Sequence, residues 1–448
     1  MAAAELKTNK NKNVVGAEGF LENERDLDHY DPFLNRPQGA NTSDLGTFLH
    51  LMKAATATGI LFLPNAFRRT GYVMAIVCGL FVGVIYAHNC VVLVRCAQIL
   101  CRRHRVPKLD FAETVEVSFL TGPERTRAHG KTFGVFTNIV ICFIQYIAVV
   151  IYILYVASSF QQLFEFYVNI TLDLRLYVIL FYPICCLLVL VPNLRYLTPF
   201  SAIGTVFFVL GIAVSWIYFL DDFPDPTRLD RFTTVPSVPM YCSIFLYALH
   251  NITLLLPLEN TMANPENMPR LVGIATIINT LIYIAFGFLG YNKYKESCDT
   301  VTKNLPLDDT LFQLVKIGIA LSVLFSLGIT YIVPVDIIWP LIMKKINLDP
   351  DHKMIFRLVG ISIATLVAIA VPQMLPLIGL LSALGMSCSM LLFPMLIDIN
   401  TNWQEPTQLL FIKNGFIFLI FLLIMIFGAI ESIHTMIKEY GGVKQEGC

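Results

Sequence analysis

His50-Leu-Met-Lys-Ala-Ala-Thr-Ala-Thr-Gly59-Ile-Leu-Phe-Leu-Pro64 is an apolar run that threonines, a glycine and a proline interrupt. A second run of this kind, Tyr247-Ala-Leu-His-Asn-Ile-Thr-Leu-Leu-Leu-Pro257-Leu-Glu259-Asn260, has a polar cluster that is again followed by a proline. In lipid, backbone groups must be satisfied internally, so a membrane helix that breaks exposes the freed groups to protein, water or ligand. The two runs therefore predict two broken membrane helices, and each break is a candidate binding site.

The rest of the chain is typical of a membrane protein with many spans. Of its 448 residues, 56% are apolar and 14% are charged, and the mean hydropathy is +0.66, whereas about 25% of residues are charged in soluble globular domains. Because a spanning helix needs about 20 mostly apolar residues, we predict an all-α integral membrane protein with about eleven transmembrane helices. They lie near 45–67, 72–96, 133–160, 176–192, 198–220, 240–258, 271–291, 311–339, 355–371, 377–397 and 412–433.

These spans form one transmembrane domain, residues 45–433, between a polar N-terminal tail, residues 1–44, and a short C-terminal tail, residues 434–448. With a cytosolic N-terminus, lysine and arginine are more frequent in the cytosolic loops, as the positive-inside rule requires. An odd number of spans then places the C-terminal tail outside the cytosol. The sequon Asn169-Ile-Thr falls in an outward loop, which predicts glycosylation of Asn169 in a secretory-pathway protein.

The interrupted spans are the first and the sixth, so the first ten spans divide into two sets of five. Paired interruptions at corresponding positions indicate an inverted repeat with a binding site near the membrane midplane. Coincidence is the competing interpretation, because proline and glycine are common in transmembrane helices. The N-terminus of a half-helix suits a substrate carboxylate, and freed carbonyls suit an ammonium. An amino-acid zwitterion is the simplest solute with both groups, although other small acids or amines fit the same chemistry.

Four titratable side chains lie at or beside the breaks. His50 precedes the first break and His250 lies within the second, and because histidine titrates at about pH 6.5, either is a candidate for proton coupling. The competing interpretation for both is a neutral histidine that is hydrogen-bonded within the bundle. Lys53 lies one turn from His50 and must pair, snorkel or face water. Glu259 lies at the cytosolic end of the sixth span, where we expect a structural role, such as an ion pair with Arg270.

Several functional classes are disfavoured. There is no P-loop, HExxH, paired CxxC or GxSxG sequence, so we expect neither an enzyme nor an ATP-driven pump, and no cofactor or metal. Lysine plus arginine and aspartate plus glutamate number 32 each, so the net charge gives no sign of nucleic acid binding. The expected partners are a small solute, protons as the coupling ion and the lipid bilayer.

Together these residues resemble the proton-coupled amino acid transporter family, within the amino acid/auxin permease group of the APC superfamily. The resemblance runs from about Gly46 to Glu431. It rests on motifs in a fixed order: His50-Leu-Met-Lys, Thr58-Gly59-Ile-Leu-Phe-Leu-Pro64, Cys101-Arg-Arg, Asn193-Leu-Arg195, Leu256-Pro-Leu-Glu-Asn260 and Asn304-Leu-Pro306. It implies a LeuT-like fold of five plus five helices with one extra helix, and proton symport of small neutral amino acids such as glycine, alanine and proline. The implied location is the plasma membrane or a lysosomal or endosomal membrane.

The resemblance also implies which residues form the site. His50 matches the histidine that the family is thought to use in proton coupling, and His250 is our second candidate. The other expected residues lie within the two breaks or beside them. The substrate-binding set is Ala54, Ala55, Thr56, Ala57, Thr58, Gly59, Leu249, Asn251, Ile252 and Thr253, and the structural or gating set is Lys53, Pro64, Pro257 and Glu259.

Two departures from the family pattern affect the breaks. Where such transporters typically have Lys-Gly-Asn-Ile-Gly-Thr-Gly, this chain has Lys53-Ala-Ala-Thr-Ala-Thr-Gly59, and alanine resists unwinding more than glycine does by about 1 kcal/mol per residue. Where they typically have Phe-Glu-Gly, it has Leu249-His-Asn251. The alternative function is therefore an amino acid sensor or transceptor that transports weakly or not at all, with its N-terminal tail reserved for signalling partners. A channel is a third class.

Overall fold

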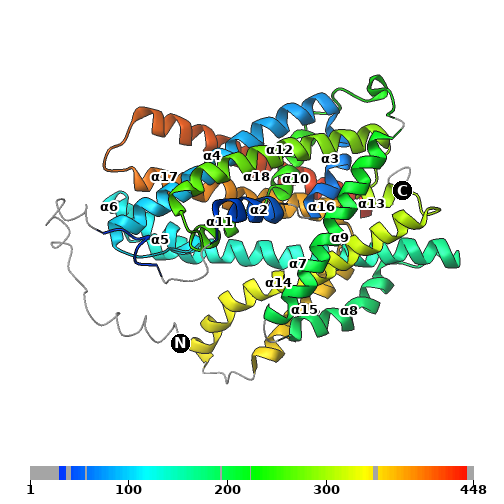
Figure 1. Ribbon diagram of the computed structural model, residues 1–448, viewed down its shortest axis with the longest axis horizontal. Helices are drawn as coiled ribbons and strands as arrows, with labels where there is room; N and C mark the ends of the chain where they lie inside the picture. Colours follow the sequence, from blue (N-terminus) through cyan, green and yellow to red (C-terminus); the bar gives the residue numbers. More distant parts are fainter. Residues whose placement is uncertain are drawn as a thin grey trace.

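The computed structural model describes residues 30–36, 42–55, 58–191, 194–221, 223–346 and 352–440. Helices account for nearly all regular structure in these ranges, which confirms the predicted all-α class (Figure 1). One isolated β-bridge among them joins Thr42 to Met262. Most of the predicted N-terminal tail and residues 441–448 of the C-terminal tail lie outside the described residues.

Ten helical segments of the described chain are long and apolar enough to cross a membrane. They are Asp44–Thr70, Tyr72–His104, Gly130–Val168, Ala202–Leu220, Ser237–Glu259, Pro265–Lys293, Thr310–Met343, His352–Ala370, Met374–Thr401 and Gln408–Lys438. The remaining predicted span, 176–192, corresponds to α8 (Leu174–Leu190), an apolar helix of 17 residues. The segments follow the predicted order, so the multi-pass helical bundle is confirmed.

Several helices extend beyond the apolar runs that reveal them in the sequence. α7 (Gly130–Val168) has 39 residues, which is about 58 Å at 1.5 Å per residue, whereas the hydrocarbon core of a bilayer is about 30 Å thick. The predicted span 133–160 covers only its apolar part. A hydropathy window therefore finds the segment that lies in lipid but not the helix ends.

Helices of the first half of the chain pack against their counterparts in the second half. Four pairs have this relation: α3 (Leu63–Thr70) with α10 (Ser237–Ala248), α4 (Tyr72–His104) with α12 (Met268–Lys293), α7 with α14 (Thr310–Ile346), and α8 with α15 (His352–Ala370). Each pair joins one span to the span five positions later, as a five-plus-five repeat requires, and α4 and α12 lie side by side in Figure 1. α9 (Leu194–Leu220) packs against α14, and the extra helix α18 (Gln408–Tyr440) packs against α10.

The tenth span is not uniformly α-helical. Its four segments are α16 (Met374–Leu381), the π-helical stretches η5 (Ser382–Met386) and η6 (Cys388–Leu392), and α17 (Phe393–Thr401). π-helical turns inside helices occur frequently at functional sites. Both stretches contact α7, and η5 also contacts α10, so the irregular part of this span lies beside the broken sixth span.

Short helices occupy the loops: α5 (Phe111–Thr121), α6 (Glu124–Arg127), η3 (Pro226–Arg228), η4 (Pro265–Asn267) and α13 (Val301–Asn304). α5 begins at a capping box, in which the Asp110 backbone N–H donates to the Glu113 carboxylate at 3.0 Å. This arrangement satisfies backbone groups that the first turn of a helix leaves unpaired. α5 packs against α7 and α17 and so joins the third and tenth spans.

Candidate functional site

The first span is interrupted in the middle of the run that opens the sequence argument. α2 (Asp44–Ala55) is followed by Thr56 and Ala57, which lie outside the described residues, and then by η2 (Thr58–Phe62) and α3. The side chain of Ala55 also lies outside them, and Ala54 is half-buried at the end of α2. Pro64 occupies the first turn of α3, where its missing N–H leaves no helical hydrogen bond unmade.

The sixth span is interrupted between α10 and α11 (Ile252–Glu259). Residues 249–251 are not α-helical, and Asn251 has φ −141° and ψ 5°. Ile252 and Thr253, which the sequence assigns to the break, form the first turn of α11 instead. The break is therefore shorter than expected, because the helix resumes directly after Asn251.

The two breaks lie against each other. A Cβ atom on Gly59 would lie 2.5 Å from the Ala248 Cα and 2.9 Å from the Ala248 N, distances that real Cβ atoms essentially never show. Because glycine has no Cβ, it allows the η2 backbone to cross the end of α10 at this separation. Gly59 therefore sets the spacing of the two broken helices, which is a packing role as well as the predicted binding role.

Hydroxyl groups from four spans gather beside this crossing. The Thr58 Oγ1 of η2 lies 3.3 Å from the Tyr247 Oη of α10, and both side chains are buried. The Tyr152 hydroxyl of α7 lies beside the side chains of Thr58 and of Thr330 in α14. A hydroxyl both donates and accepts hydrogen bonds. The first, third, sixth and eighth spans thus form a small polar centre beside the crossing of the two breaks.

Asn251 is fixed by the second span. The Tyr86 Oη of α4 donates to the Asn251 Oδ1 at 2.7 Å, and the Asn251 backbone N–H donates to the Tyr86 Oη at 3.4 Å. The two side chains are almost fully buried. The Asn251 side chain, which is a predicted substrate contact, therefore already takes part in a hydrogen bond that positions the break.

The two candidate proton-coupling histidines lie in different surroundings. His250 is within the second break, and its Nδ1 is buried without a hydrogen-bond partner in the described part of the chain. His50 and Lys53 lie on the exposed side of α2, whose buried side carries Thr47 and Leu51. His250 is therefore the interior histidine of the two. Because His50 is exposed, it is not a core histidine, which was the competing interpretation.

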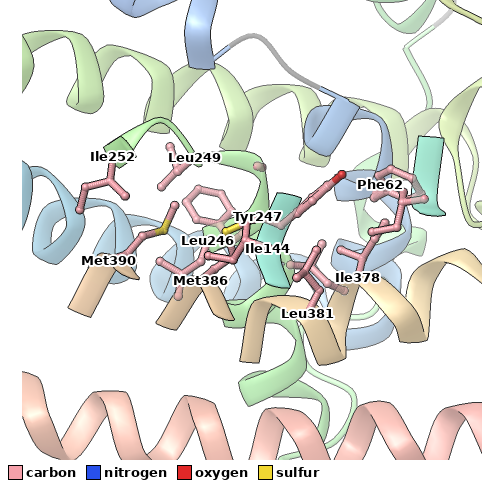
Figure 2. Packing of buried hydrophobic residues seen from close by; sticks show 14 of the residues in the cluster. Phe62, Ile144, Leu246, Tyr247, Leu249, Ile252, Ile378, Leu381, Met386 and Met390 are labelled. Atoms are coloured by element: carbon pink, nitrogen blue, oxygen red, sulfur yellow. The ribbon is translucent and has the colours of Figure 1, made fainter. Parts of the chain in front are cut away.

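Apolar side chains enclose the breaks. Figure 2 shows those of the broken helices together with those of α7 and the tenth span, namely Phe62, Ile144, Leu246, Tyr247, Leu249, Ile252, Ile378, Leu381, Met386 and Met390. The Phe62 and Tyr247 rings meet edge to face, with centroids 6.4 Å apart. A mostly apolar wall with a few convergent polar groups is the usual composition of a site for a small molecule.

Glu259, at the end of α11, is paired with Arg36 rather than with the expected Arg270. The Arg36 Nη2 lies 2.9 Å from both Glu259 carboxylate oxygens, and the two side chains are only 8% and 4% exposed. Gln98 Nε2 donates to the Glu259 Oε1 at 3.2 Å, while Pro257 is exposed in α11. The sequence did not reveal this pair, because Arg36 belongs to the polar tail and is separated from Glu259 by five spans.

Asn169 caps the C-terminal end of α7 with a left-handed backbone, φ 55°, and its side chain is exposed. This exposure leaves room for the predicted glycan, and the modification stays a prediction. Among the described residues, no group of three or more histidine, cysteine, aspartate and glutamate side chains is arranged to hold a metal ion.

Three side chains beside the breaks were not selected from the sequence: the buried Tyr86 and the half-buried Tyr152 and Thr330. Each is a single hydroxyl within an apolar run, and such residues are too frequent in membrane helices to mark a site. A signal was present for the tyrosines, since membrane proteins concentrate this residue at the lipid–water interfaces and both lie well inside their predicted spans. Placing them at one site required knowledge of which spans are neighbours.

Comparison with known proteins identifies the family of this chain. The family described as transmembrane amino acid transporter protein matches residues 40–434. The proton-coupled amino acid transporter-like protein pathetic of Drosophila melanogaster is 32% identical to this chain, with 93% of this chain and 90% of that protein covered. The probable amino acid transporter skat-1 of Caenorhabditis elegans is 26% identical, with 87% and 88% covered.

Among solved structures, the inward-facing conformation of Mhp1 is similar to this chain, with a TM-score of 0.52 and 92% of each chain covered. The sequence identity is 10%, so the likeness concerns the fold alone. It agrees with the pairing of each span with the span five positions later, and the predicted LeuT-like architecture is confirmed.

Proposed function

Because the chain belongs to the transmembrane amino acid transporter family, we propose that it carries small neutral amino acids across the membrane by symport with protons. The family membership makes this multi-pass membrane protein an amino acid transporter and not an enzyme. The substrate class and the coupling ion are the proposal. The observation that supports it most is the contact of the two helix breaks at Gly59 and Ala248.

The groups around the breaks suit a zwitterion. The N-terminus of α11 carries unpaired N–H groups and the positive end of a helix dipole, and the C-terminal carbonyls of α10 carry the opposite partial charge. The hydroxyls of Thr58, Tyr152 and Tyr247 lie beside them. An amino acid carries both groups on its α-carbon, so its carboxylate would lie at the N-terminus of α11 and its ammonium at the C-terminus of α10.

The surrounding side chains favour a small and neutral substrate. A substrate bound there would lie beside the buried apolar side chains that Figure 2 shows, and an ionised substrate side chain is costly to bury in such surroundings. Large side chains such as Phe62, Tyr247 and Met386 occupy the space beside the breaks. Such packing would favour a substrate with a small side chain, such as glycine, alanine or proline.

His250 supports proton coupling. A proton on its unpartnered Nδ1 would create a buried positive charge, which is costly unless an anion lies close to it. A substrate carboxylate bound between the breaks would supply that anion. Proton and substrate would then each strengthen the binding of the other, which is the thermodynamic requirement for coupling. His50, exposed on α2, would exchange protons with the solution.

The same proposal includes orientation and location. The N-terminus is cytosolic, because the basic loops then lie inside, and Asn169 is then on the outer or luminal end of α7. A proton symporter needs a membrane with an acidic side, which the plasma membrane and the lysosomal or endosomal membranes provide. The alternative of a non-transporting sensor is not favoured, since the named relatives are described as transporters or transporter-like.

Uptake of labelled alanine, glycine and proline by cells that express the chain tests the proposal. We expect saturable uptake that is several-fold greater at an external pH of about 5.5 than at about 7.5, in line with histidine titration. His250→Gln and His50→Gln should abolish this pH dependence, whereas the exposed loop variant His129→Gln should retain it. Wild-type uptake that does not respond to pH would contradict proton coupling, and absent uptake despite protein at the surface would contradict the substrate class.

A further inference from the structure

Two polar side chains lie on the exposed side of the membrane helix α4. His88 and Arg95 are both exposed, and because they are seven residues apart, which is almost two full turns, they lie on the same side of the helix. Val77 and Val84 continue this side towards the start of α4, at 56% and 61% exposed. A surface that is apolar along the first part of α4 therefore becomes basic towards its end.

α18 lies beside this surface and adds a third basic side chain. The exposed rings of Phe81 in α4 and Phe416 in α18 meet edge to face, with centroids 6.1 Å apart. Lys413, three residues before Phe416, has a side chain that is 30% exposed. Its charge acts on His88, as does the charge of Arg95. These three accessible side chains, His88, Arg95 and Lys413, form what we call the basic face.

One acid balances only part of this charge. Asp398 of α17 is 5% exposed and accepts hydrogen bonds from Lys413 Nζ at 2.7 Å and from Asn414 Nδ2 at 2.8 Å. Asn402 Nδ2 also donates to it, at 3.0 Å. Arg95, by contrast, makes no hydrogen bond or ion pair within the described ranges. The basic face therefore has a surplus of positive charge and a guanidinium that is available to a ligand.

The basic face lies where an apolar surface ends. The predicted span 72–96 ends beside Arg95, and the predicted span 412–433 begins beside Lys413. Both cations are thus at the boundary between lipid tails and headgroups, and a basic side chain deep among the tails would be costly. Basic residues gathered between membrane helices at this level bind anionic lipid headgroups. A lipid matches the surface in both respects, because its tails are apolar and its phosphate is negative.

We propose that the basic face binds the headgroup of one anionic phospholipid. The phosphate would accept hydrogen bonds from the Arg95 guanidinium and from the Lys413 ammonium, which has three donors and uses one of them for Asp398. His88 lies about 10 Å further along α4 at 1.5 Å per residue and would donate to the ester groups below the phosphate. The acyl chains would lie along the apolar part of the same surface.

Such a lipid would join two helices that also contact the sixth break. α4 carries Tyr86, whose hydroxyl donates to Asn251 in that break, and α18 packs against α10. A ligand that binds only the folded arrangement of these helices stabilises it. In the proposed orientation this end of α4 faces the cytosol, whose leaflet contains the anionic lipids. The inference goes beyond the proposed function, because lipid binding requires neither transport nor a particular substrate.

Lipid binding to the purified full-length chain in detergent tests this inference. Native mass spectrometry would count bound phosphatidylglycerol, the anionic probe, and bound phosphatidylcholine, which has a phosphate but no net charge. We expect one phosphatidylglycerol per chain, bound at least about fivefold more tightly than phosphatidylcholine, which is the effect of one basic residue near an anionic surface. The double variant His88→Gln with Arg95→Gln should bind the two lipids equally.

The matched control removes the same two residue types from an exposed loop. His129→Gln with Arg125→Gln changes side chains in and beside α6, away from the basic face, and should keep the preference for phosphatidylglycerol. Arg95→Lys retains the charge and should keep the preference as well. Lys413 is left unchanged, because Asp398 would otherwise be buried without its cation.

Two results would overturn the inference. Equal binding of the two lipids by the wild type would mean that Arg95 reaches any headgroup and selects none. A preference that persists in the double variant, or that the control loses equally, would place the lipid elsewhere on the chain. Neither result bears on the proposed transport, which the uptake of labelled amino acids measures separately.

Discussion

The two broken helices are held in different ways. Both halves of the sixth span are fixed, because α10 is buried without interruption from Met240 to Ala248 and α11 ends at the buried pair of Glu259 with Arg36. In the first span α3 is buried, but α2 exposes Leu45 and Leu49, at 68% and 59%. Segments with few buried contacts open at the lowest free energy. The comparison indicates that the sixth break is a fixed element and that α2 is the half-helix most able to move.

The beginning of α2 is nevertheless tied to the end of the sixth span. The Thr42 backbone N–H donates to the Thr261 carbonyl at 2.8 Å, and the Ala263 N–H donates to the Thr42 carbonyl at 3.0 Å. Asn267 Nδ2 donates to the Asp44 carboxylate at 2.7 Å. α2 and the end of α11 are therefore joined, so that a movement of α2 is transmitted to the loop after α11.

Arg36→Ala tests how the sixth span is held, and we expect it to cause the largest loss of stability. It leaves the carboxylate of Glu259 buried and without its guanidinium partner, and the loss of one member of a buried ion pair costs about 3–5 kcal/mol. Thermal unfolding of the purified protein in detergent measures the change. Lys353→Ala is the matched control, because its pair with Asp336 is exposed and is worth about 0–1 kcal/mol. Equal shifts for the two variants would mean that the Arg36 pair does not hold the sixth span.

A smaller loss of stability but a complete loss of transport is expected from Gly59→Ala. The added methyl group would collide with the backbone of Ala248, and overpacking of this kind costs about 1–3 kcal/mol. The two breaks would be forced apart and the site between them deformed. Gly415→Ala is the control, since nothing lies within 4 Å of its added Cβ. Normal uptake by Gly59→Ala would show that the crossing is not part of the site.

The smallest effect is expected from Tyr86→Phe, which removes the donor to the Asn251 Oδ1 and should cost about 1 kcal/mol. Uptake should fall as well, because the break at Asn251 loses its anchor to α4. Tyr146→Phe removes a comparable hydrogen bond, to the Gly360 carbonyl, on the boundary of α7 and α15. We expect a similar stability loss there with uptake unchanged. Equal uptake by the two variants would show that the Tyr86–Asn251 hydrogen bond does not contribute to the binding site.

The sequence predicted the spans and both interruptions because these depend on local features. An apolar run of about 20 residues is a strong indication of a membrane-spanning helix. A polar cluster followed by proline is easily recognised within such a run. Long-range partners were not predictable in the same way. The Arg36–Glu259 pair and the Tyr86–Asn251 hydrogen bond join residues that are 223 and 165 positions apart, and no local pattern marks either partner.

The burial of individual residues at the breaks could not be predicted from the sequence. His50 was expected beside the first break and lies on the exposed side of α2, whereas His250 is the interior histidine with an unpartnered nitrogen. Sequence position alone could not distinguish these surroundings, because the face that a helix buries depends on its neighbours. The missing glycines before Gly59 did not prevent the interruption of the first span, since the described chain contains the 3-10 helix η2 between α2 and α3.

Counterflow in proteoliposomes tests the central claim most directly. Vesicles that contain the purified chain and are loaded with unlabelled alanine should transiently accumulate labelled alanine from outside, which requires turnover but no knowledge of the coupling ion. We predict accumulation for the wild type and for Gly415→Ala, and none for Gly59→Ala. Absence of accumulation in a wild-type protein that unfolds cooperatively on heating would contradict alanine transport through the crossing of the two broken helices.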